Sequence, residues 1–371
     1  MDPNREPVEY LRSGDAWRDY CDGLKEAGSD VFRDLAPDAP IDLAEAHRYL
    51  TRMVRFGFEQ IMEGGDPRLP VFVASLCETQ KSGWDNPDNH HTNAYIGGAY
   101  TYRVWGRRGD CHYMSFAVYG GSLGRKGDRR TIAYVKLDDL EVDDRGYFEI
   151  ILSQEKQPGN WIPLADDATT LMVRETFSRK LEQERSVLQI ECLSDEPPPT
   201  LTPEFVVAGF RRSLRFMRGS AKIFFDTVDA WVPNPNVFNQ GNPQKAAETL
   251  GIPDQLYKSG WWECATDRAL VIDVMPPECR YWSMSLNDYW GGSFDYRYWK
   301  IHLNKHTAAY RPDGSVRIIV SHRDPGLADT NWLDTAGHDR GVWLIRWLEP
   351  SEDRLPTVRE MSFAELSRLA D

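Results

Sequence analysis

The chain has 371 residues, of which 41% are hydrophobic and 27% charged, and its formal net charge is −13. This length is too great for one ordinary hydrophobic core, so we expect two domains. The acidic balance argues against nucleic acid as a partner, because phosphates need a basic surface, and against anionic membrane surfaces. The 13 tryptophans fit a cleft that stacks on an apolar or sugar-like small molecule.

Location and redox state follow from the same totals. No apolar run approaches the roughly 18 residues that a membrane span needs. The first residues, MDPNREPVEYLRSGDAW, are charged and contain no apolar signal core, so we expect a cytoplasmic protein. The six cysteines are scattered without a CxxC pair, which favours buried reduced thiols over a zinc ribbon or a redox pair.

The first range, residues 1–83, is predicted to be helical. In DLAEAHRYLTRMVRFGFEQIMEG, apolar residues such as Leu43, Ala46 and Leu50 recur at helical spacing. His47 lies on this stripe, and we interpret it as a packed helix residue rather than a ligand.

From Tyr95 onward the apolar pattern changes to a period of two, which predicts strands. We assign residues 84–196 to a first β-sandwich, which the prolines 197–199 end. Thr202 is a good N-cap with Pro203 after it, so a helix of about two dozen residues should open a helical bridge over 197–260. Strands then return in a second β-sandwich at 261–350, and 351–371 form a tail with a short helix.

The two strand-rich ranges repeat one another at an offset of 168 residues. Cys111 aligns with Cys279, and the segment that begins at Gly146 aligns with the one that begins at Gly314. Small insertions then bring two Asn-Trp pairs into register, Asn160-Trp161 and Asn331-Trp332. We predict a mainly β protein with helical additions, in which two related antiparallel sandwiches are joined by a helical segment. The Asn-Trp pairs occur in both copies and are interpreted as structural: the Asn bonds its turn and the Trp plugs the sandwich end.

Several segments together resemble a bacterial family of unknown function. They are DNPDN, GAYTYRVWGRRG, PGNWIPL, YWSMSLNDYW, SFDYRY, DGSVRIIVSHRDPG and NWLDTAGH. The pattern resembles the domain-of-unknown-function 1214 family, with a 1254-type domain in the first half. The resemblance implies an Ig-like domain followed by a jelly-roll-like one, and it implies no settled chemistry. Where the family commonly has Tyr or Thr after NPDN, this chain has His90 and His91.

The second copy contains acid and base candidates that the first copy lacks. His322 continues the inward-facing row of its strand, and the first copy has Gln154 at that place. Imidazole titrates near neutrality, so we take His322 as the candidate acid or base, with His338 beside it and Asp324 or Asp334 to orient it. A histidine that only caps a loop remains the alternative.

The candidate substrate-binding residues are cationic, aromatic or adjacent to the unusual histidines. Arg346 lies in an otherwise apolar row, where it needs either a structural carboxylate or a ligand anion. In SFDYRYWKIHLN the residues alternate as in a strand, with one row suited to line a cleft or to face solvent. The complete set is Arg346, Arg297, Trp282, Trp290, Tyr298, Trp299, Asp88, His90 and His91.

Two functions remain open at this point. The first is an enzyme that acts on a small organic metabolite by acid–base chemistry, as a lyase, hydrolase or isomerase, in a pocket of the second sandwich. The second is a non-catalytic protein that binds a sugar or an apolar small molecule. We expect no cofactor and no metal, because His322, Asp324, Asp334 and His338 lack a compact ligand spacing. The oligomeric state, including a homo-oligomer, is left open.

Overall fold

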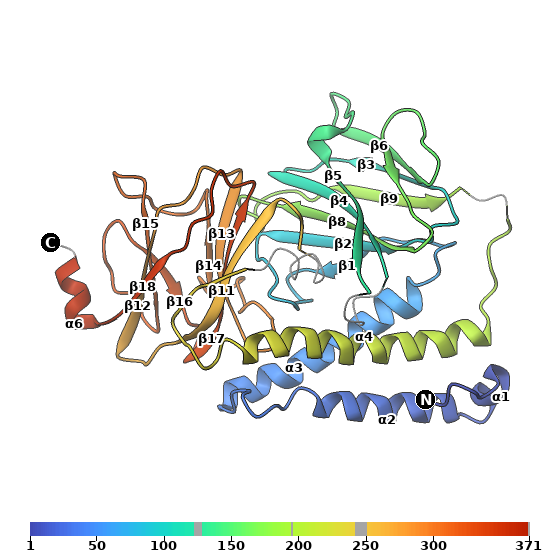
Figure 1. The fold of residues 1–371 in the computed structure, drawn as a ribbon, viewed down its shortest axis with the longest axis horizontal. Coiled ribbons are helices and arrows are strands. Elements are labelled where there is room, and N and C mark those ends of the chain that lie inside the picture. The colour runs from blue at the N-terminus through green and yellow to red at the C-terminus, as the bar shows by residue number, and fades with distance from the viewer. Residues whose placement is uncertain (122–127, 194–195, 242–250, 370–371) are drawn as a thin grey trace. The chain divides into compact units, whose positions relative to one another are not determined.

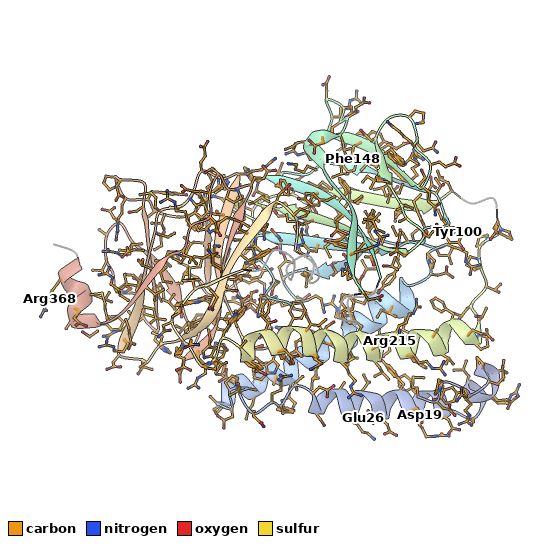
Figure 2. The ribbon with its side chains drawn as sticks, in the orientation of Figure 1. Asp19, Glu26, Tyr100, Phe148, Arg215 and Arg368 are labelled. Atoms are coloured by element: carbon orange, nitrogen blue, oxygen red, sulfur yellow. The ribbon has the colours of Figure 1, made fainter. Side chains whose placement is uncertain are left out.

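The computed structural model describes residues 1–121, 128–193, 196–241 and 251–369, and Figures 1 and 2 show its ribbon and its side chains. Parts of three predicted ranges, 84–196, 197–260 and 351–371, fall outside these residues. The chain divides into two compact units, and each takes residues from more than one predicted range. The first unit comprises Met1–Arg33, Leu50–Gln80 and Asp88–Ile223, and the second comprises Asp34–Tyr49, Lys81–Pro87 and Phe224–Asp371.

One of the α-helices, α4 (Pro203–Asp229), begins at the N-cap that the sequence predicts. The α-helices of the described chain are α1 (Pro7–Arg12), α2 (Asp15–Ser29), α3 (Pro40–Phe56), α4 (Pro203–Asp229) and α6 (Phe363–Leu366), and a π-helix at Gly57–Glu63 follows α3. The predicted cap of α4 is confirmed, since the Thr202 hydroxyl accepts a hydrogen bond from the Phe205 amide at 3.2 Å. No helix among these residues is long and apolar enough to cross a membrane.

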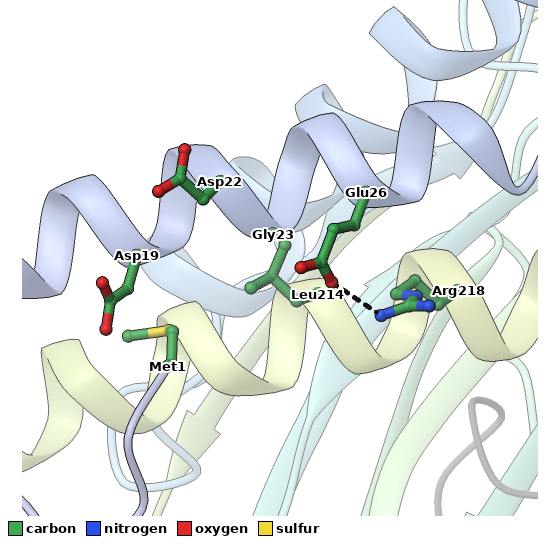
Figure 3. A pocket seen from close by; sticks show the side chains of 7 residues that line it. All are labelled: Met1, Asp19, Asp22, Gly23, Glu26, Leu214 and Arg218. Carbon is green, nitrogen blue, oxygen red and sulfur yellow. Dashed lines mark hydrogen bonds and ion pairs between the residues drawn. The ribbon is translucent and has the colours of Figure 1, made fainter.

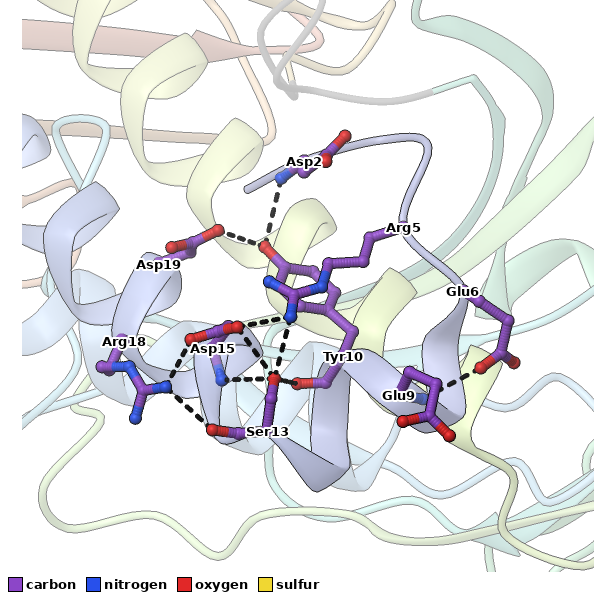
Figure 4. A network of polar contacts seen from close by, with 9 residues as sticks. All are labelled: Asp2, Arg5, Glu6, Glu9, Tyr10, Ser13, Asp15, Arg18 and Asp19. Atoms are coloured by element: carbon purple, nitrogen blue, oxygen red, sulfur yellow. Dashed lines mark hydrogen bonds and ion pairs between the residues drawn. The ribbon is translucent and has the colours of Figure 1, made fainter.

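The turn between α1 and α2 is held by charged side chains (Figure 4). Arg18 donates to the Ser13 carbonyl at 2.8 Å, and Arg5 donates to the Ser13 hydroxyl at 3.2 Å. Hydrogen bonds from Arg18, Ser13 and Arg5 lower the pKa of Asp15 to about 2. These groups form hydrogen bonds at the polar ends of two short helices. Helices of this length are only marginally stable as isolated peptides.

The predicted apolar stripe of α3 is confirmed only in part, since Ala46 and Met53 are buried. Leu43 is 40% exposed and His47 is exposed, with its Nδ1 at 2.8 Å from the Leu43 carbonyl oxygen. The buried face instead runs from Asp42 through Ala46 and Tyr49. A carboxylate therefore opens the buried face of this helix.

The first unit contains a sandwich of two sheets. Its five-stranded sheet has the order β1-β2-β8-β4-β5, with bounds Val73–Leu76, Asn89–Tyr95, Ala168–Thr176, Tyr113–Gly120 and Arg130–Lys136. Its four-stranded sheet has the order β7-β6-β3-β9, with bounds Trp161–Pro163, Tyr147–Ser153, Tyr102–Arg107 and Val187–Cys192. Phe116 and Val173 of the larger sheet pack with Ile150 and Val104 of the smaller one in a single core.

The second unit has the same architecture. Its five-stranded sheet has the order β10-β11-β17-β13-β14, with bounds Asn239–Gln240, Gln255–Glu263, Arg340–Leu348, Tyr281–Asn287 and His302–Asn304. Its four-stranded sheet has the order β16-β15-β12-β18, with bounds Asn331–Asp334, Val316–Ser321, Arg268–Val274 and Thr357–Ser362. Trp343 and Trp282 pack with Ile318 and Leu270 in its core.

Strand numbers in the second unit equal those in the first plus nine, in both sheets and in the same order. The predicted pairing of segments is confirmed, because Tyr147–Ser153 forms β6 and Val316–Ser321 forms β15. The register repeats as well: Ser115 lies opposite Arg174, and Ser283 lies opposite Arg346. The resemblance named the two domains Ig-like and jelly-roll-like, and their strand order is the same.

The Asn-Trp pairs fix equivalent turns in both units. The Asn160 side chain bonds the backbone of Glu141 at 2.7 and 2.8 Å and the Glu149 carbonyl at 3.0 Å. Asn331 makes the matching bonds to Ala309 and to the Arg317 carbonyl, at 2.7, 2.9 and 3.0 Å. The two tryptophans are only half-buried, so they cover these turns rather than fill the sandwich ends.

The strand predicted across SFDYRYWKIHLN is wrong in its first half. Residues 296–298 form a turn, and β14 begins at His302. The Asp295 carboxylate accepts from the Arg297 amide at 3.2 Å and from the Arg297 guanidinium, so the local turn outcompetes the strand pattern.

Candidate functional site

His322 lies at the end of β15 and is half-buried. Its Nε2 is 3.0 Å from the Cys264 carbonyl oxygen, which can only accept, so Nε2 carries a proton. Its Nδ1 is 3.2 Å from the Thr335 hydroxyl, and Asp339 lies 3.8 Å from Nε2. Both ring nitrogens are thereby engaged by the protein.

The first unit shows what this arrangement does. Gln154, which follows β6 as His322 follows β15, donates to the Gly98 carbonyl at 2.9 Å. Gly98 lies between β2 and β3, and Cys264 lies between the corresponding strands β11 and β12. The two side chains therefore cap equivalent loops, and this favours the structural interpretation of His322.

The two aspartates named with His322 serve their own turns. Asp324 is exposed and accepts from the Gly326 amide at 2.8 Å, while Asp334 accepts from the Ala336 amide at 2.8 Å. Each is an ordinary side-chain-to-backbone turn bond. The His322 ring contacts Cys264, Thr335 and Asp339 instead.

His338 is more deeply buried, at 3% exposure, and its ring stacks on Phe294 with centroids 4.0 Å apart. Its Nδ1 donates to the Thr335 carbonyl at 3.2 Å. Its Nε2 is buried without a hydrogen-bond partner in the described chain, and burial lowers the pKa of the ring. Thr335 thus contacts both predicted histidines, and His338 is the one whose second ring nitrogen has no partner among the described residues.

The arginines expected to hold an anion are occupied. Arg346 is buried and donates to the Ser285 hydroxyl at 3.2 Å and to the Trp84 carbonyl. Arg297 donates twice to Asp295, at 2.8 and 2.6 Å, and Asp295 raises its pKa. Both guanidinium groups stabilise their own unit.

The predicted aromatic wall is dispersed. Trp282 lies in the sandwich core and donates to the Tyr310 hydroxyl at 3.0 Å, and Trp290 is 1% exposed. Tyr298 and Trp299 are 77% and 48% exposed. These four rings do not line one cleft.

The residues of the DNPDNHH segment that lie in the first unit are buried. The Asp88 carbonyl accepts from the Phe177 amide at 2.9 Å. Burial and the nearby Arg185, 3.3 Å away, lower the pKa of His90 to about 4, so this ring is neutral. His91 accepts from Arg174 at 3.0 Å.

A different group of residues stands out on the five-stranded sheet of the first unit. We call it the polar face: the residues of β2, β8, β4 and β5 that pair across the sheet and point away from the core. Its four rows are Asn89, Thr176 and Tyr113; His91, Arg174, Ser115 and Lys136; Asn93, Met172, Ala117 and Tyr134; and Tyr95, Thr170, Tyr119 and Thr131. The intervening residues, such as Phe116 and Val118, belong to the core.

The polar face gathers buried polar atoms that no described group satisfies. They are Asn93 Oδ1, Ser115 Oγ, the Tyr119 hydroxyl and Thr131 Oγ1, and Nε of the adjacent Arg129 joins them. Ser115 and Tyr119 are 1% and 0% exposed. Each such group costs roughly 1–3 kcal/mol when it stays unsatisfied, so a cluster of them on one face calls for an explanation.

Arg129 lies at the end of this face, with its guanidinium 4.0 Å from the centre of the Tyr119 ring. It is 9% exposed, and burial lowers its pKa. No ion pair or hydrogen bond joins its side chain to any described residue. Its neighbour Arg130 instead pairs with Asp167 at 2.9 Å.

Sequence reasoning missed the polar face although part of the signal is present. In YMSFAVYG, Tyr113, Ser115, Ala117 and Tyr119 alternate with apolar residues, and NHHTNAY places Asn89, His91, Asn93 and Tyr95 at the same period. Strands that face water on one side show the same alternation. This face differs from a solvated one only because the residues that point away from the core are buried as well. The sequence does not reveal that burial.

The equivalent face of the second unit is more apolar and already covered. Val342 and Leu344 of β17 lie on it, and Trp261 of β11 pairs with Val342. Arg346 donates to the carbonyl of Trp84, which belongs to the 81–87 segment of the same unit. The two faces thus differ in chemistry although the strands that carry them have the same order.

Two surface hollows of the first unit lie between α2 and α4. The first has a volume of about 370 Å³ and includes Asp19, Asp22 and Glu26 among its lining residues (Figure 3). In it Arg218 pairs with Glu26 at 3.2 Å. The second, of about 460 Å³, adjoins it and is lined mainly by basic residues. Both contain paired, exposed charges, which are ordinary surface features.

Comparison with known proteins gives relatives without an assigned activity. A family model described as "Protein of unknown function (DUF1214)" matches residues 267–352, which span β12 to β17. No curated protein matches the chain. An uncharacterised protein from Burkholderia cenocepacia is 36% identical, with a TM-score of 0.91, over 96% of this chain and 99% of that one.

A protein from Vibrio parahaemolyticus is 12% identical, with a TM-score of 0.48, over 85% of this chain and 97% of that one, a likeness too weak to bear on function. The Burkholderia protein is similar in sequence and fold over nearly the whole length. The chain therefore belongs to the same family as the Burkholderia cenocepacia protein, and its second unit carries the DUF1214 domain of unknown function.

Proposed function

We propose that the protein binds a small, polar organic molecule at the polar face of the first unit. The observation that carries this proposal is the cluster of buried hydrogen-bonding atoms on Asn93, Ser115, Tyr119 and Thr131 without partners among the described residues. Buried polar groups in folded proteins are nearly always satisfied. A ligand that meets several of them at once recovers the free energy that each loses on burial.

Binding fits this face better than acid–base catalysis does. The four rows contain no aspartate or glutamate, and the His91 ring already accepts from Arg174. Acid–base catalysis needs a proton donor or acceptor within hydrogen-bond reach of the substrate. The polar face supplies hydroxyls, an amide and cations, which suit the recognition of a polar molecule.

The test uses one variant in each unit at equivalent positions. Ser115→Ala removes a hydroxyl of the polar face, and Ser283→Ala removes the hydroxyl at the matching register of the second unit. A thermal-shift screen of small sugars and organic acids would first identify a stabilising molecule. Ser115→Ala should then reduce its effect on Tm, and Ser283→Ala should leave that effect unchanged.

Native mass spectrometry of the purified chain provides an independent measurement, because a tightly held molecule adds its mass to the protein. The proposal fails if no molecule raises Tm and none co-purifies. It also fails if the Ser115 and Ser283 variants respond to the ligand alike, since the effect would then not depend on the polar face.

A second candidate function is acid–base catalysis in the second unit, centred on His338 rather than on His322. The free, buried Nε2 of His338 favours it, together with Asp42, whose pKa burial raises to about 6. Glu45 and Asp339 influence the pKa values of both groups, so the two lie in one electrostatic environment. Two titratable groups pushed in opposite directions by burial are typical of acid–base sites.

The catalytic candidate is tested by turnover of small esters and hydroxy acids between pH 5 and 8. His338→Gln and Asp42→Asn should each abolish a turnover that the wild-type chain shows, whereas His322→Gln should retain it. Absence of turnover in the wild-type chain would leave His338 as a packed core histidine.

We also propose that the first unit corresponds to the 1254-type domain and that the two units arose by duplication. The identical strand order and the shared Asn-Trp turns support the second part. Solved structures of separate 1254-type domains provide the test, since they should superpose on β1 to β9 with the strand order of the first unit.

A further inference from the structure

The polar face carries an excess of positive charge in a strongly acidic protein. The chain has a formal net charge of −13, yet the four rows contain Arg174, Lys136 and no carboxylate. Arg129 adds a further guanidinium at the end of the face. A concentration of one sign of charge against the sign of the whole protein favours a ligand of the opposite charge.

Arg129 is the cation best placed to receive such a ligand. Buried arginines are normally paired, because an unpaired buried charge is costly. The neighbouring Arg130 is paired with Asp167, whereas the described chain offers Arg129 only the face of the Tyr119 ring. A ring contact satisfies one face of a guanidinium and leaves its N–H edges available for a carboxylate or phosphate.

The groups around Arg129 determine which hydrogen-bonding groups the rest of the ligand must carry. Burial raises the pKa of Tyr95, while Arg212 of α4 and Arg129 lower it in part, so both guanidinium groups lie near this hydroxyl. Asn93 Oδ1 can only accept a hydrogen bond, so its partner must donate. The hydroxyls of Ser115, Tyr119 and Thr131 can donate or accept. A molecule with several hydroxyl groups and one anionic group matches this set.

We propose that the ligand of the polar face is a hydroxylated organic carboxylate, of the sugar-acid class, whose carboxylate binds Arg129. This inference rests on the proposed binding function and adds the charge and chemical class of the ligand. The carboxylate replaces the acidic partner that Arg129 lacks among the described residues, and the ligand hydroxyls meet the unsatisfied hydroxyls of Tyr119 and Thr131, which pair across β4 and β5 beside it. A neutral sugar would leave the guanidinium unsatisfied, and a simple carboxylate would leave the other groups so.

The experiment compares three probes by isothermal titration calorimetry on the full chain: glucuronate, glucose and acetate. We expect glucuronate to bind more tightly than either of the others. Arg129→Met should weaken glucuronate by about tenfold or more, since it removes a charged, two-pronged hydrogen-bond donor. Arg130→Met is the matched control, because Arg130 is exposed and paired with Asp167, and it should leave glucuronate binding unchanged.

A second variant guards against loss of folding. Arg129→Lys keeps the positive charge and removes the two-pronged donor of the guanidinium group. Its affinity for glucuronate should therefore fall between those of the wild type and Arg129→Met. Circular dichroism reports the folded state of each variant. Inorganic phosphate is included as a fourth probe. If phosphate matches glucuronate, the carboxylate class is wrong.

The outcomes separate this inference from the function on which it rests. Equal binding of glucose and glucuronate, with no effect of Arg129→Met, would overturn the anionic ligand and keep the binding function. Binding of none of the four probes overturns the sugar-acid class, and the wider thermal-shift screen then decides the binding function. Equal losses of glucuronate affinity in the Arg129→Met and Arg130→Met variants would show that Arg129 does not bind the ligand.

Discussion

Gln154 and His322 occupy the same position directly after two equivalent strands and reach carbonyl oxygens in two equivalent loops. Gln154 donates to Gly98 at 2.9 Å, and His322 lies 3.0 Å from the Cys264 carbonyl oxygen. A glutamine amide and an imidazole are both long enough to bridge a strand end to the neighbouring loop. The histidine of the second unit is thus a chemical variant of a cap that the first unit builds with an amide.

The first prediction concerns this cap. His322→Gln should leave Tm nearly unchanged, because the new amide can donate to the Cys264 carbonyl, whereas His322→Ala should lose about 1 kcal/mol of unfolding free energy. Urea denaturation of the two variants measures the difference. Ligand binding at the polar face should persist in both, and its loss in a folded His322→Gln variant would contradict the purely structural role of His322.

The second prediction concerns the Asn-Trp turns. Asn331→Ala removes three hydrogen bonds to backbone groups and should cost about 2–3 kcal/mol of stability. Trp332→Ala should cost less than the ~3–5 kcal/mol of a fully buried tryptophan, because this ring is half-buried. Chemical denaturation measures both losses, and a loss from Trp332→Ala as large as the ~3–5 kcal/mol of a fully buried tryptophan would contradict the turn-covering role.

The third prediction concerns pH. Burial raises the pKa of Asp42 from 3.8 to about 6. The unfolded chain therefore releases this proton first, so Asp42 destabilises the fold progressively as pH rises from about 4 to about 6, and fully above that. Asp42→Asn should stabilise the protein by about 2 kcal/mol at pH 7, after allowance for the lost favourable contact of an acid with the first turn of α3.

The same substitution should have little effect at pH 3.5, where Asp42 is protonated in the folded state and mostly protonated in the unfolded state, and this measurement serves as the internal control. Thermal denaturation between pH 3.5 and 7.5 gives the curve. A gain that is constant over the whole range would show that proton release from Asp42 is not its cause.

The fourth prediction compares two tyrosines of the same strand. The Tyr119 hydroxyl is buried without a partner among the described residues, whereas the Tyr113 hydroxyl bonds that of Tyr134. Tyr119→Phe should therefore hold or raise stability by up to about 1 kcal/mol, and Tyr113→Phe should lower it by about 1 kcal/mol. Functional sites commonly exchange stability for binding in this way. Equal losses in both variants would show that Tyr119 has a partner within the protein.

The fifth prediction is that the protein holds no tight metal ion. The described residues contain no group of three or more His, Cys, Asp or Glu side chains that could hold one. Chelation with EDTA should leave Tm unchanged, and elemental analysis should find far less than one equivalent of zinc, iron or manganese. One equivalent per chain would contradict this expectation.

The fold was predictable because it repeats. A constant offset between Gly146 and Gly314 identifies equivalent strands without knowledge of their partners, and the Asn-Trp pairs mark the same turn twice. The strand expected around Tyr298 was wrong because alternation alone does not register that Asp295 closes a local turn. Local hydrogen bonds of this kind compete with strands whenever a short polar side chain precedes them.

The candidate site was less predictable because it depends on long-range register. Tyr95, Thr170 and Tyr119 form one row only after β2, β8 and β4 pair. Nothing in the sequence near Ser115 reveals that it faces Arg174. Asp42 escaped notice for a simpler reason, since the apolar stripe of α3 was placed on Leu43 and the buried face begins one residue earlier.

The contact between Arg346 and Trp84 indicates how the polar face of the first unit can be covered. In the second unit, an arginine of the central strand donates to a carbonyl oxygen supplied by a separate stretch of the same chain. That stretch covers the outer face of the sheet in the way that a bound molecule would. Asn86 of the same stretch also donates to the Tyr281 hydroxyl, at 3.4 Å, on the same sheet. The second unit therefore shows the same type of sheet with its outer face covered. In it, the arginine of the central strand hydrogen-bonds to a carbonyl oxygen of the covering segment.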